Sequence, residues 1–300
     1  MSRPSNFLTS RQLADSIGVS ESSVKRWVDD GTIKADRTAG GHRRIPVAAA
    51  IGYIRDHGVA VSKPHMLSIA STPRIGPVDE DAVETLLAAL LDDRAAECRA
   101  IIAGRYLGGA RVASIADNLI RPVMRGLGEI WLERPEGILL EHRAVDTCVQ
   151  ALAEIGSWLG TAPDSAPAAV TAGGPGDPYL LAPMLACLVL REAGIQTHNL
   201  GPQTPLETIG LALSRYGARL GAISFSTPIS PRIESAWHTL RRNAEEIDVR
   251  IVVGGRGSEA LPLKGRDGVR VCSTMSELAD YASGWVEGAG GQCSRMENRT

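Results

Sequence analysis

The sequence predicts a multidomain protein with three folded parts: an α-helical winged helix-turn-helix, an α-helical four-helix bundle, and an α/β domain with a Rossmann-like (flavodoxin-like), five-stranded parallel sheet. Two capped helices and a basic hairpin fill residues 1–57. Apolar residues recur at helical spacing over 79–160, which is typical of a bundle. Short apolar runs alternate with helical stretches over 169–288, the order that produces parallel sheets.

Two short helices with capping signals open the chain. Thr9 and Gln12 have the spacing of a capping box, and Gly18 is expected to end the first helix. Ser20 begins the second helix, which Gly31 closes. Its polar face combines hydroxyls with cations, the composition of a DNA recognition helix, because hydroxyls meet base edges and cations meet phosphates. The predicted DNA-contacting residues are Ser22, Ser23, Lys25 and Arg26.

A basic hairpin is predicted directly after the second helix. Two short strands, 32–37 and 42–45, flank a turn whose two glycines permit positive φ. Cations beside a flexible tip suit a wing that lies along a DNA groove and neutralises phosphates. Pro46 then starts a third helix that runs to about His57. The expected wing contacts are Arg37, His42, Arg43 and Arg44.

Charge is distributed unevenly along the chain. The formal net charge is −2, but residues 1–57 hold nine Lys and Arg against six Asp and Glu, a net +3, which leaves −5 for the remainder. DNA contact is therefore expected only at the front of the chain. This head resembles the MerR-type regulators, and the stretch GGHRRI at 40–45 carries most of the likeness. The resemblance implies double-stranded operator DNA as a partner, bound by dimers.

Residues 58–78 contain three prolines and no clear period, so they are expected to be a linker that lets the head move relative to the later domains. Four helices are predicted for the bundle over 79–160. Trp131 and the pair Glu141 and His142 stand out within it. A role in a pocket is one interpretation. The local pattern favours the other, a core tryptophan and a glutamate that complements a helix dipole.

The α/β domain of residues 169–288 comes after a linker at 161–168 and precedes a tail, 289–300, that is expected to be disordered. Ligands of doubly wound sheets bind at the carboxyl ends of the strands. Those ends are rich in glycine and hydroxyl groups, so the backbone can approach a flat or bulky ligand closely. A GxGxxG fingerprint and a P-loop are absent, which disfavours nicotinamide and nucleoside triphosphates. The predicted strand ends are 173–177, 201–204, 224–227 and 254–257.

Composition limits the class of protein. With 44% hydrophobic residues and a mean hydropathy of −0.03, the 300-residue chain is expected to be a cytoplasmic globular protein with no membrane partner. No apolar run approaches the ~18 residues of a membrane span, and no signal peptide is evident. Five scattered cysteines without a CxxC pair predict reduced thiols and argue against zinc. No catalytic residue is placed by motif, so the chain is expected not to be an enzyme.

The two later domains together resemble the cobalamin-binding module of methionine synthase, because the third and fourth strands end in Ser-x-x and Gly-Gly. With the MerR-type head, nearly the whole chain resembles the light-sensing, cobalamin-dependent repressors of the CarH and LitR family. The resemblance implies adenosylcobalamin as cofactor, self-association to a DNA-binding dimer or tetramer, and release of the operator by light. By position, Trp131, Glu141 and His142 match the cap residues and Ser224, Gly254 and Gly255 the tail pocket.

The chain departs from this family at one motif. Where the family has Asp/Glu-x-His-x-x-Gly, whose histidine ligates cobalt, residues 177–182 are DPYLLA, so Tyr179 replaces the histidine. A phenol with a pKa of ~10 is a poor substitute for a neutral imidazole. Leu132 stands where light-sensing relatives can offer a second histidine. No metal ligand is assigned firmly; by position His142 and His198 are the nearest replacements, and His238 is a poorer one.

Three outcomes for the sensor stay open. In the first, cobalamin binds without a lower ligand from the protein. In the second, the pocket binds another tetrapyrrole or another flat ligand. In the third, the module only assembles oligomers. In the first two, ligand binding changes the oligomer or the freedom of the heads, and with it the avidity for paired half-sites. The alternative of another class is a corrinoid carrier for methyl transfer, which would need the histidine and has no use for a winged head.

Overall fold

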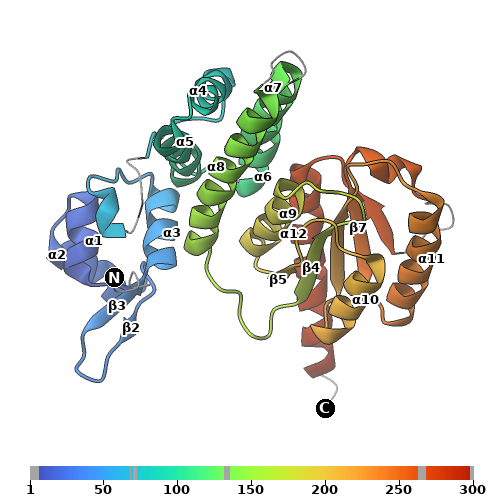
Figure 1. Ribbon diagram of the computed structural model, residues 1–300. Coiled ribbons are helices and arrows are strands. Elements are labelled where there is room, and N and C mark those ends of the chain that lie inside the picture. Colours follow the sequence, from blue (N-terminus) through green and yellow to red (C-terminus); the bar gives the residue numbers. More distant parts are fainter. Residues whose placement is uncertain (1–6, 68, 70–72, 132–135, 263–267, 298–300) are drawn as a thin grey trace. The chain divides into compact units, whose positions relative to one another are not determined.

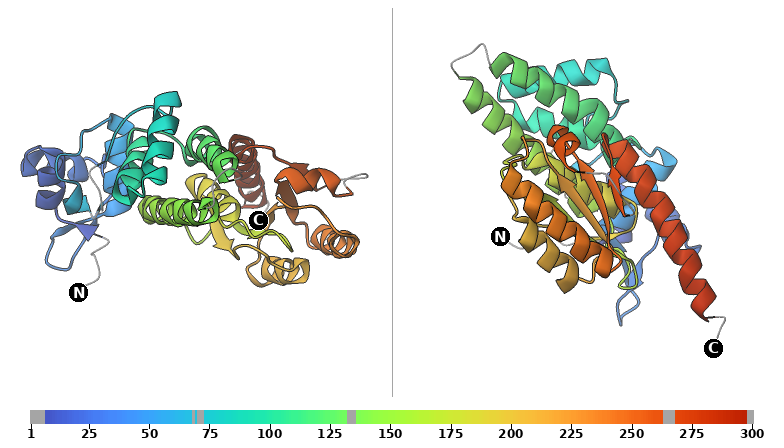
Figure 2. Two further views of the ribbon diagram at one scale, coloured as in Figure 1. Left: turned by 45° about the horizontal axis from the view of Figure 1, so that its top comes forward. Right: turned by 90° about the vertical axis from the view of Figure 1, so that its right-hand side faces the viewer.

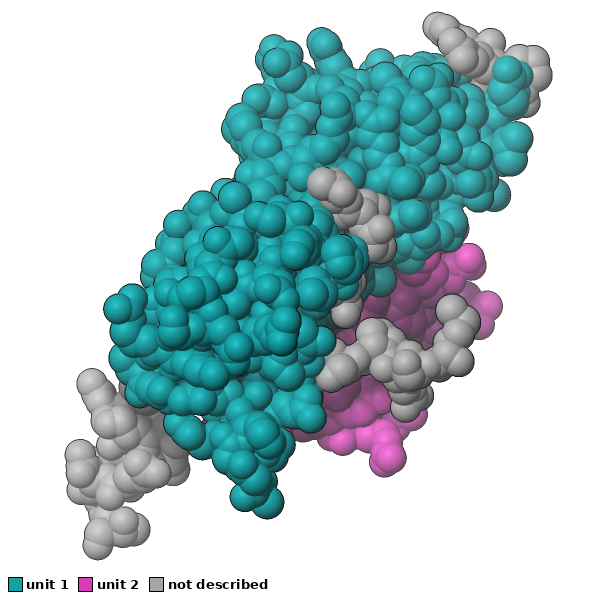
Figure 3. Space-filling model, turned by 90° about the vertical axis from the view of Figure 1, so that its left-hand side faces the viewer, with its two compact units in different colours: residues 1–160 teal, residues 161–300 magenta. Residues whose placement is uncertain are grey.

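The structure is a computed structural model that describes residues 7–67, 69, 73–131, 136–262 and 268–297. It divides into two compact units, residues 1–160 and residues 161–300 (Figure 3). No described helix is long and apolar enough to span a bilayer.

The capping signals of the first two helices are confirmed. Thr9 and Gln12 form a complete capping box, and Gly18, with φ of 71°, ends the first helix in the left-handed conformation. The Ser20 side chain accepts a hydrogen bond from the backbone N–H of Ser23 and caps the second helix. A strand at Phe7 is an addition to the prediction. The elements are β1 (Phe7–Leu8), α1 (Ser10–Ile17), α2 (Glu21–Asp29), β2 (Asp36–Arg37), β3 (Arg43–Pro46) and α3 (Val47–His57).

Part of the segment expected to be a flexible linker, 58–78, is hydrogen-bonded to other parts of the chain. The backbone N–H groups of Ser62 and Lys63 both donate to the carbonyl of Ser16, at 2.8 and 3.0 Å. A short 3-10 turn, η1 (Pro64–Leu67), comes next and packs against α1, with Leu67 fully buried. These contacts hold residues 62–67 against α1.

Residues 1–160 therefore form one unit that contains both the head and the bundle. Helix α3 packs against two bundle helices, α5 (Ala95–Leu107) and α8 (Gly137–Trp158) (Figure 1). The guanidinium of Arg55 on α3 lies over the ring of Tyr106 on α5 and donates to the carbonyl of Ala110. Cation–aromatic and polar contacts thus place α3 against the bundle, while the expectation that the head moves relative to the later domains stays a prediction.

The predicted helical bundle is present. Its remaining helices are α4 (Glu80–Leu91) and a long segment over 112–131, which a π-helical turn divides. Buried aliphatic side chains of α5, α7 and α8 fill the bundle, with Cys98 and Cys148 among them. The long segment consists of α6 (Val112–Ile115), the turn Ala116–Ile120 and α7 (Arg121–Trp131).

The second unit contains the predicted five-stranded parallel sheet, in the order β5-β4-β6-β7-β8. This order is flavodoxin-like, and its switch point lies beside the first strand of the domain, β4. Helices α9 and α12 cover one face and α10 and α11 the other (Figure 1). The strands are β4 (Ala168–Gly173), β5 (Gln196–Asn199), β6 (Leu220–Ser224), β7 (Arg250–Gly254) and β8 (Val269–Val271). The helices are α9 (Leu181–Glu192), α10 (Leu206–Arg215), α11 (Pro231–Glu246) and α12 (Met275–Glu297).

Helix α12 differs from its prediction in length. It runs to Glu297 and extends past the end of the strands (Figure 2), although residues 289–300 were expected to be a disordered tail. The predicted helix at 258–262 is a 3-10 turn, η3 (Arg256–Ala260). Neither difference changes the sheet.

Candidate nucleic-acid interface and strand-edge loops

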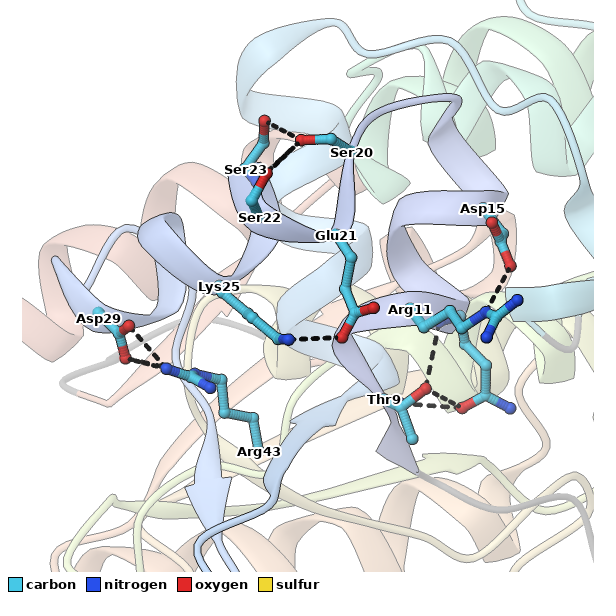
Figure 4. Close-up of polar contacts among 11 residues, drawn as sticks. Thr9, Arg11, Asp15, Ser20, Glu21, Ser22, Ser23, Lys25, Asp29 and Arg43 are labelled. Carbon is cyan, nitrogen blue, oxygen red and sulfur yellow. Dashed lines mark hydrogen bonds and ion pairs between the residues drawn. The ribbon is translucent and has the colours of Figure 1, made fainter.

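Three serine hydroxyls gather at the N-terminus of α2 (Figure 4). Ser20 Oγ lies 2.8 Å from Ser22 Oγ and 2.9 Å from Ser23 Oγ. Ser22 is exposed and Ser23 half-buried, so Ser22 is the better placed to contact a partner. A helix N-terminus favours anions, because its first N–H groups lack partners within the helix.

The two predicted cations of α2 differ in their surroundings. Lys25 Nζ forms an ion pair with Glu21, 2.9 Å away on the same helix (Figure 4). The hydrogen bond from Lys25 holds the pKa of the Glu21 carboxyl below its usual range. Arg26 is exposed and makes no ion pair with any residue of the described chain. Arg26 is therefore the α2 cation that is available to an outside anion.

Two of the predicted wing cations are anchored to α2 instead of extending from the hairpin. Arg37 Nη2 lies 2.9 Å from Asp29 Oδ1, and Arg43 binds both oxygens of the same carboxylate. The hydrogen bonds from Arg43 lower the pKa of the Asp29 carboxyl. His42 and Arg44 are exposed. Because side chains alternate along a strand, Arg44 points to the face opposite Arg43.

The hairpin and β1 border a hollow on the surface. A surface hollow of about 430 Å³ is lined by Phe7, Asp36, Arg37, Thr38 and Arg44. Phe7 is 38% exposed, in register with Pro46 on β3. Phe7 is not among the residues predicted from sequence; its apolar ring ahead of a capping box was the available signal.

At the carboxyl ends of the second unit's strands, one carboxylate joins two loops. Asp177 is fully buried. It accepts hydrogen bonds from the backbone N–H of Tyr179 at 3.1 Å and of Ser226 at 2.8 Å, and from the Ser224 hydroxyl at 3.3 Å. The loop after β4 is thereby closed on itself and bonded to the loop after β6. Ser224, a predicted cofactor-binding residue, takes part in this network.

Tyr179 stands where the resemblance places the cobalt-ligating histidine. The residue is 47% exposed, and its bond to Asp177 comes from the backbone. His198 lies on β5 and stacks on Tyr216 at 3.7 Å between ring centroids, while His238 is exposed on α11. Among the described residues, no group of three or more His, Cys, Asp or Glu side chains is placed to hold a metal ion.

Several glycines at these strand ends lie in close contact with other residues of the chain. A Cβ on Gly174 would lie 2.4 Å from the Phe225 ring, and one on Gly255 would lie 2.5 Å from the Phe225 carbonyl oxygen. At Gly254 it would lie 2.8 Å from the carbonyl oxygen of Cys272. In the direction of an added Cβ each of these three glycines is in close contact with protein atoms, and the expectation that their backbone also approaches a ligand stays a prediction.

The predicted cap residues lie around the start of α8. Glu141 is half-buried and His142 exposed. Ile138 and Leu139, one turn earlier, are 57% and 62% exposed. Trp131 is the last residue of α7, and its side chain lies outside the described residues, as does Leu132. The structure therefore places Glu141 and His142 on one helical turn at the start of α8.

Comparisons with known proteins give the fold of the bundle and the sheet. No family model and no curated protein matches the chain. The monomethylamine corrinoid protein of Methanosarcina barkeri is similar in structure, with a TM-score of 0.52 and 17% identity over 68% of this chain and 98% of that one. A cobalamin-binding protein of Desulfitobacterium hafniense DCB-2 matches with a TM-score of 0.33, 15% identity and coverages of 68% and 98%. The helical bundle and the five-stranded sheet have the fold of a corrinoid protein.

Proposed function

We propose that this protein is a DNA-binding transcriptional regulator of the repressor type, with a MerR-like winged helix-turn-helix over residues 7–57 and a sensor of corrinoid-protein fold. One observation carries the DNA-binding part. A capped helix with exposed Ser22 and Arg26 is bonded through Asp29 to a hairpin that exposes His42 and Arg44. The pairing of a helix with a basic hairpin suits a groove and its phosphates. The proposal assigns no catalytic residue.

In this proposal α2 enters the major groove and Arg26 contacts a base or a phosphate. The hairpin runs along the backbone, where Arg44 neutralises a phosphate. Two or four copies of the chain present their heads to paired half-sites, so the avidity for DNA depends on the oligomer. Because α3 is fixed to α5 and α8, a signal alters the arrangement of head-and-bundle units and not the freedom of a tethered head.

Cobalamin is the first candidate ligand, on the grounds of fold alone. The described residues do not fit a histidine-ligated cobalt, because the loop that would supply the ligand presents the exposed phenol of Tyr179. The carboxylate of Asp177 already accepts hydrogen bonds from three donors of the protein. The proposal is therefore a sensor in which this loop gives no lower ligand. Another tetrapyrrole, or a module kept only for assembly, are the alternatives.

A corrinoid carrier for methyl transfer is the second candidate function. The likeness to the monomethylamine corrinoid protein favours it. The side-chain chemistry at Tyr179 and the basic hairpin disfavour it.

DNA binding is tested first. We would select double-stranded DNA sequences from a random pool with the full chain, then measure affinity for the selected and a scrambled duplex at several salt concentrations. Arg26→Gln should lower affinity for the selected DNA by about 5- to 150-fold if Arg26 contacts a base, because such a contact is worth about 1–3 kcal/mol. Arg232→Gln, an exposed site on α11, is the matched control and should change nothing. A wild-type chain that binds neither duplex at low salt would remove the proposal.

The ligand is tested by visible absorption. The protein is purified in the dark, incubated with adenosylcobalamin and desalted, and its spectrum is recorded before and after illumination. Retained corrin bands support cobalamin sensing, and their change in light supports a photoreceptor. A colourless protein that still binds DNA leaves the alternative of an assembly module.

A further inference from the structure

The carboxylate of Asp29 holds two arginines from two strands. Asp29 is the last residue of α2, while Arg37 lies on β2 and Arg43 on β3. Arg43 Nη2 lies 2.7 Å from Oδ2 and 2.8 Å from Oδ1, and Arg43 Nε adds a bond of 3.2 Å to Oδ1. Arg37 Nη2 reaches Oδ1 at 2.9 Å. Both strands of the hairpin are thus bonded to one carboxylate at the end of the helix, and Figure 4 shows the contact of Arg43 with Asp29.

The two arginines differ in exposure and in the number of contacts that each makes with Asp29. The Arg43 side chain is only 21% exposed and uses its planar fork on both carboxylate oxygens. The Arg37 side chain is 58% exposed and makes a single contact with Asp29. Arg43 therefore has little guanidinium surface left for a phosphate. Its role in the geometry is that of an anchor.

A second carboxylate stiffens the same junction without touching the hairpin cations. Asp30 Oδ1 accepts hydrogen bonds from the backbone N–H and the hydroxyl of Thr32, at 3.0 and 2.6 Å. The N–H of Ile33 donates to the carbonyl of Trp27 at 2.9 Å. These bonds hold the start of the connection between α2 and the hairpin. The contacts of Asp29 with Arg37 and Arg43 then fix the direction of the hairpin.

We infer that Asp29 is a positioning residue of the proposed DNA interface, an inference that rests on the proposed function. Asp29 fixes the hairpin relative to α2 through Arg43, so that Arg44, on the other face of β3, meets a phosphate at a set distance from the bases under α2. Sequence preference then depends on Asp29, although a carboxylate gains nothing from contact with DNA. Arg43 acts through Asp29 and contributes no phosphate contact.

A residue that competes with DNA for the arginines would also be an acid beside them. A carboxylate can stand in for a phosphate, and DNA would then displace Asp29 and take over Arg37 and Arg43. The two roles predict opposite results for Asp29→Asn. Removal of a positioning residue weakens binding to the selected sequence, whereas removal of a competitor strengthens binding to any DNA.

The test uses the full chain on the selected and the scrambled duplex, with Asp29→Asn, Arg43→Gln and the double variant. Each single variant should lower affinity for the selected duplex by about tenfold, with little change on the scrambled one, because coupled charge pairs fix register. The double variant should be no weaker than either single one, as expected for two residues that act as a unit. Arg44→Gln should reduce the slope of log affinity against log salt by about 1, while Arg43→Gln should leave it unchanged.

Controls separate positioning from loss of folding. A partly unfolded head loses affinity for both duplexes by the same factor, so the ratio of the two affinities is the readout that a purely structural defect does not move. Asp29→Glu keeps the charge and should restore part of that ratio. Tighter binding of Asp29→Asn to both duplexes, or an unchanged ratio, overturns the inference. A wild-type chain that binds no DNA removes the proposed function, whereas wild-type binding with an indifferent Asp29→Asn removes the inference alone.

Discussion

The guanidinium of Arg55 lies 3.6 Å from the ring centroid of Tyr106, which joins a helix of the head to a helix of the bundle. Tyr106 is 3% exposed, so the contact is shielded from water on the ring side. A shielded cation over an aromatic face is attracted by the ring's quadrupole more strongly than an exposed one. The same guanidinium donates to the Ala110 carbonyl at 3.1 Å. The direction of α3 is therefore set by the bundle.

Arg55→Gln is expected to loosen the head from the bundle. Loss of the aromatic contact should cost about 1–2 kcal/mol. Limited proteolysis should then cut the variant faster than the wild type between residues 58 and 78, and its urea midpoint should fall. Arg99→Gln removes a hydrogen bond to the Gln150 side chain within the bundle and serves as the control. Equal cleavage rates for Arg55→Gln and wild type would contradict the role given to Arg55.

Gly104→Ala is expected to displace the segment that crosses α5. A Cβ there would lie 2.2 Å from the carbonyl oxygen of Arg74, whose N–H is bonded to Ala100. Such a contact in a packed site costs roughly 1–3 kcal/mol, because backbone has to move. Gly128→Ala on α7 is the matched control, since nothing lies within 4 Å of its added methyl group. That variant should gain up to about 1 kcal/mol from helix propensity. Urea unfolding of both variants measures the difference.

Asp177→Asn is expected to destabilise the second unit. The amide oxygen can keep the two bonds that Ser224 and Ser226 make to one carboxylate oxygen, but the NH2 group then faces the N–H of Tyr179, and the charge that strengthens all three bonds is lost in a fully buried site. Hydrogen bonds to a charged group are worth about 1.5–3 kcal/mol each, so a loss of about 2 kcal/mol is predicted. Asp248→Asn breaks an ion pair with Arg219 in which both side chains are more than half exposed, and should cost under about 0.5 kcal/mol. Similar urea midpoints for the two variants would contradict the assignment.

The buried thiols of the bundle are expected to resist alkylation. Burial raises the pKa of Cys98 to about 11 and that of Cys148 to about 12. Iodoacetamide at pH 8 should modify both in urea and neither in the native protein, as read by mass spectrometry. Cys187, which is half-buried, is the internal comparison. Rapid native modification of Cys148 would show that the bundle opens.

The raised pKa values of these thiols also predict how the free energy of unfolding changes with pH. Each folded pKa lies above the unfolded value of about 8.5, so the native state holds its thiol proton longer. The free energy of unfolding is unaffected below about pH 8.5 and falls as pH rises towards the folded values, by up to about 1.4 kcal/mol per pH unit for each thiol. Cys148→Ala should flatten that fall between pH 9 and pH 11. An unchanged slope would show that other groups cause it.

Short-range patterns in the sequence were enough to specify the local elements. The capping box at Thr9, the left-handed glycine at Gly18 and the serine cap at Ser20 depend on neighbours within a few residues, so spacing predicts them. Alternation of apolar runs and helices likewise predicted the parallel sheet. Candidate residues for the proposed interface on α2 and the hairpin could be named from the same short-range patterns.

Only the folded chain shows which charges are available to a partner and which segments are fixed by contacts. Arg37 and Arg43 looked equivalent to Arg44 in sequence, but Asp29, 14 residues before Arg43, binds the first two. Prolines and a missing period suggested a linker at 58–78, yet its N–H groups bond to Ser16 and Ala100, which lie far from their partners in sequence. The strand-end glycines predicted room for a ligand, and Phe225 fills part of it. Long-range contacts of this kind leave no periodic trace, because each depends on where two distant segments meet in the folded chain.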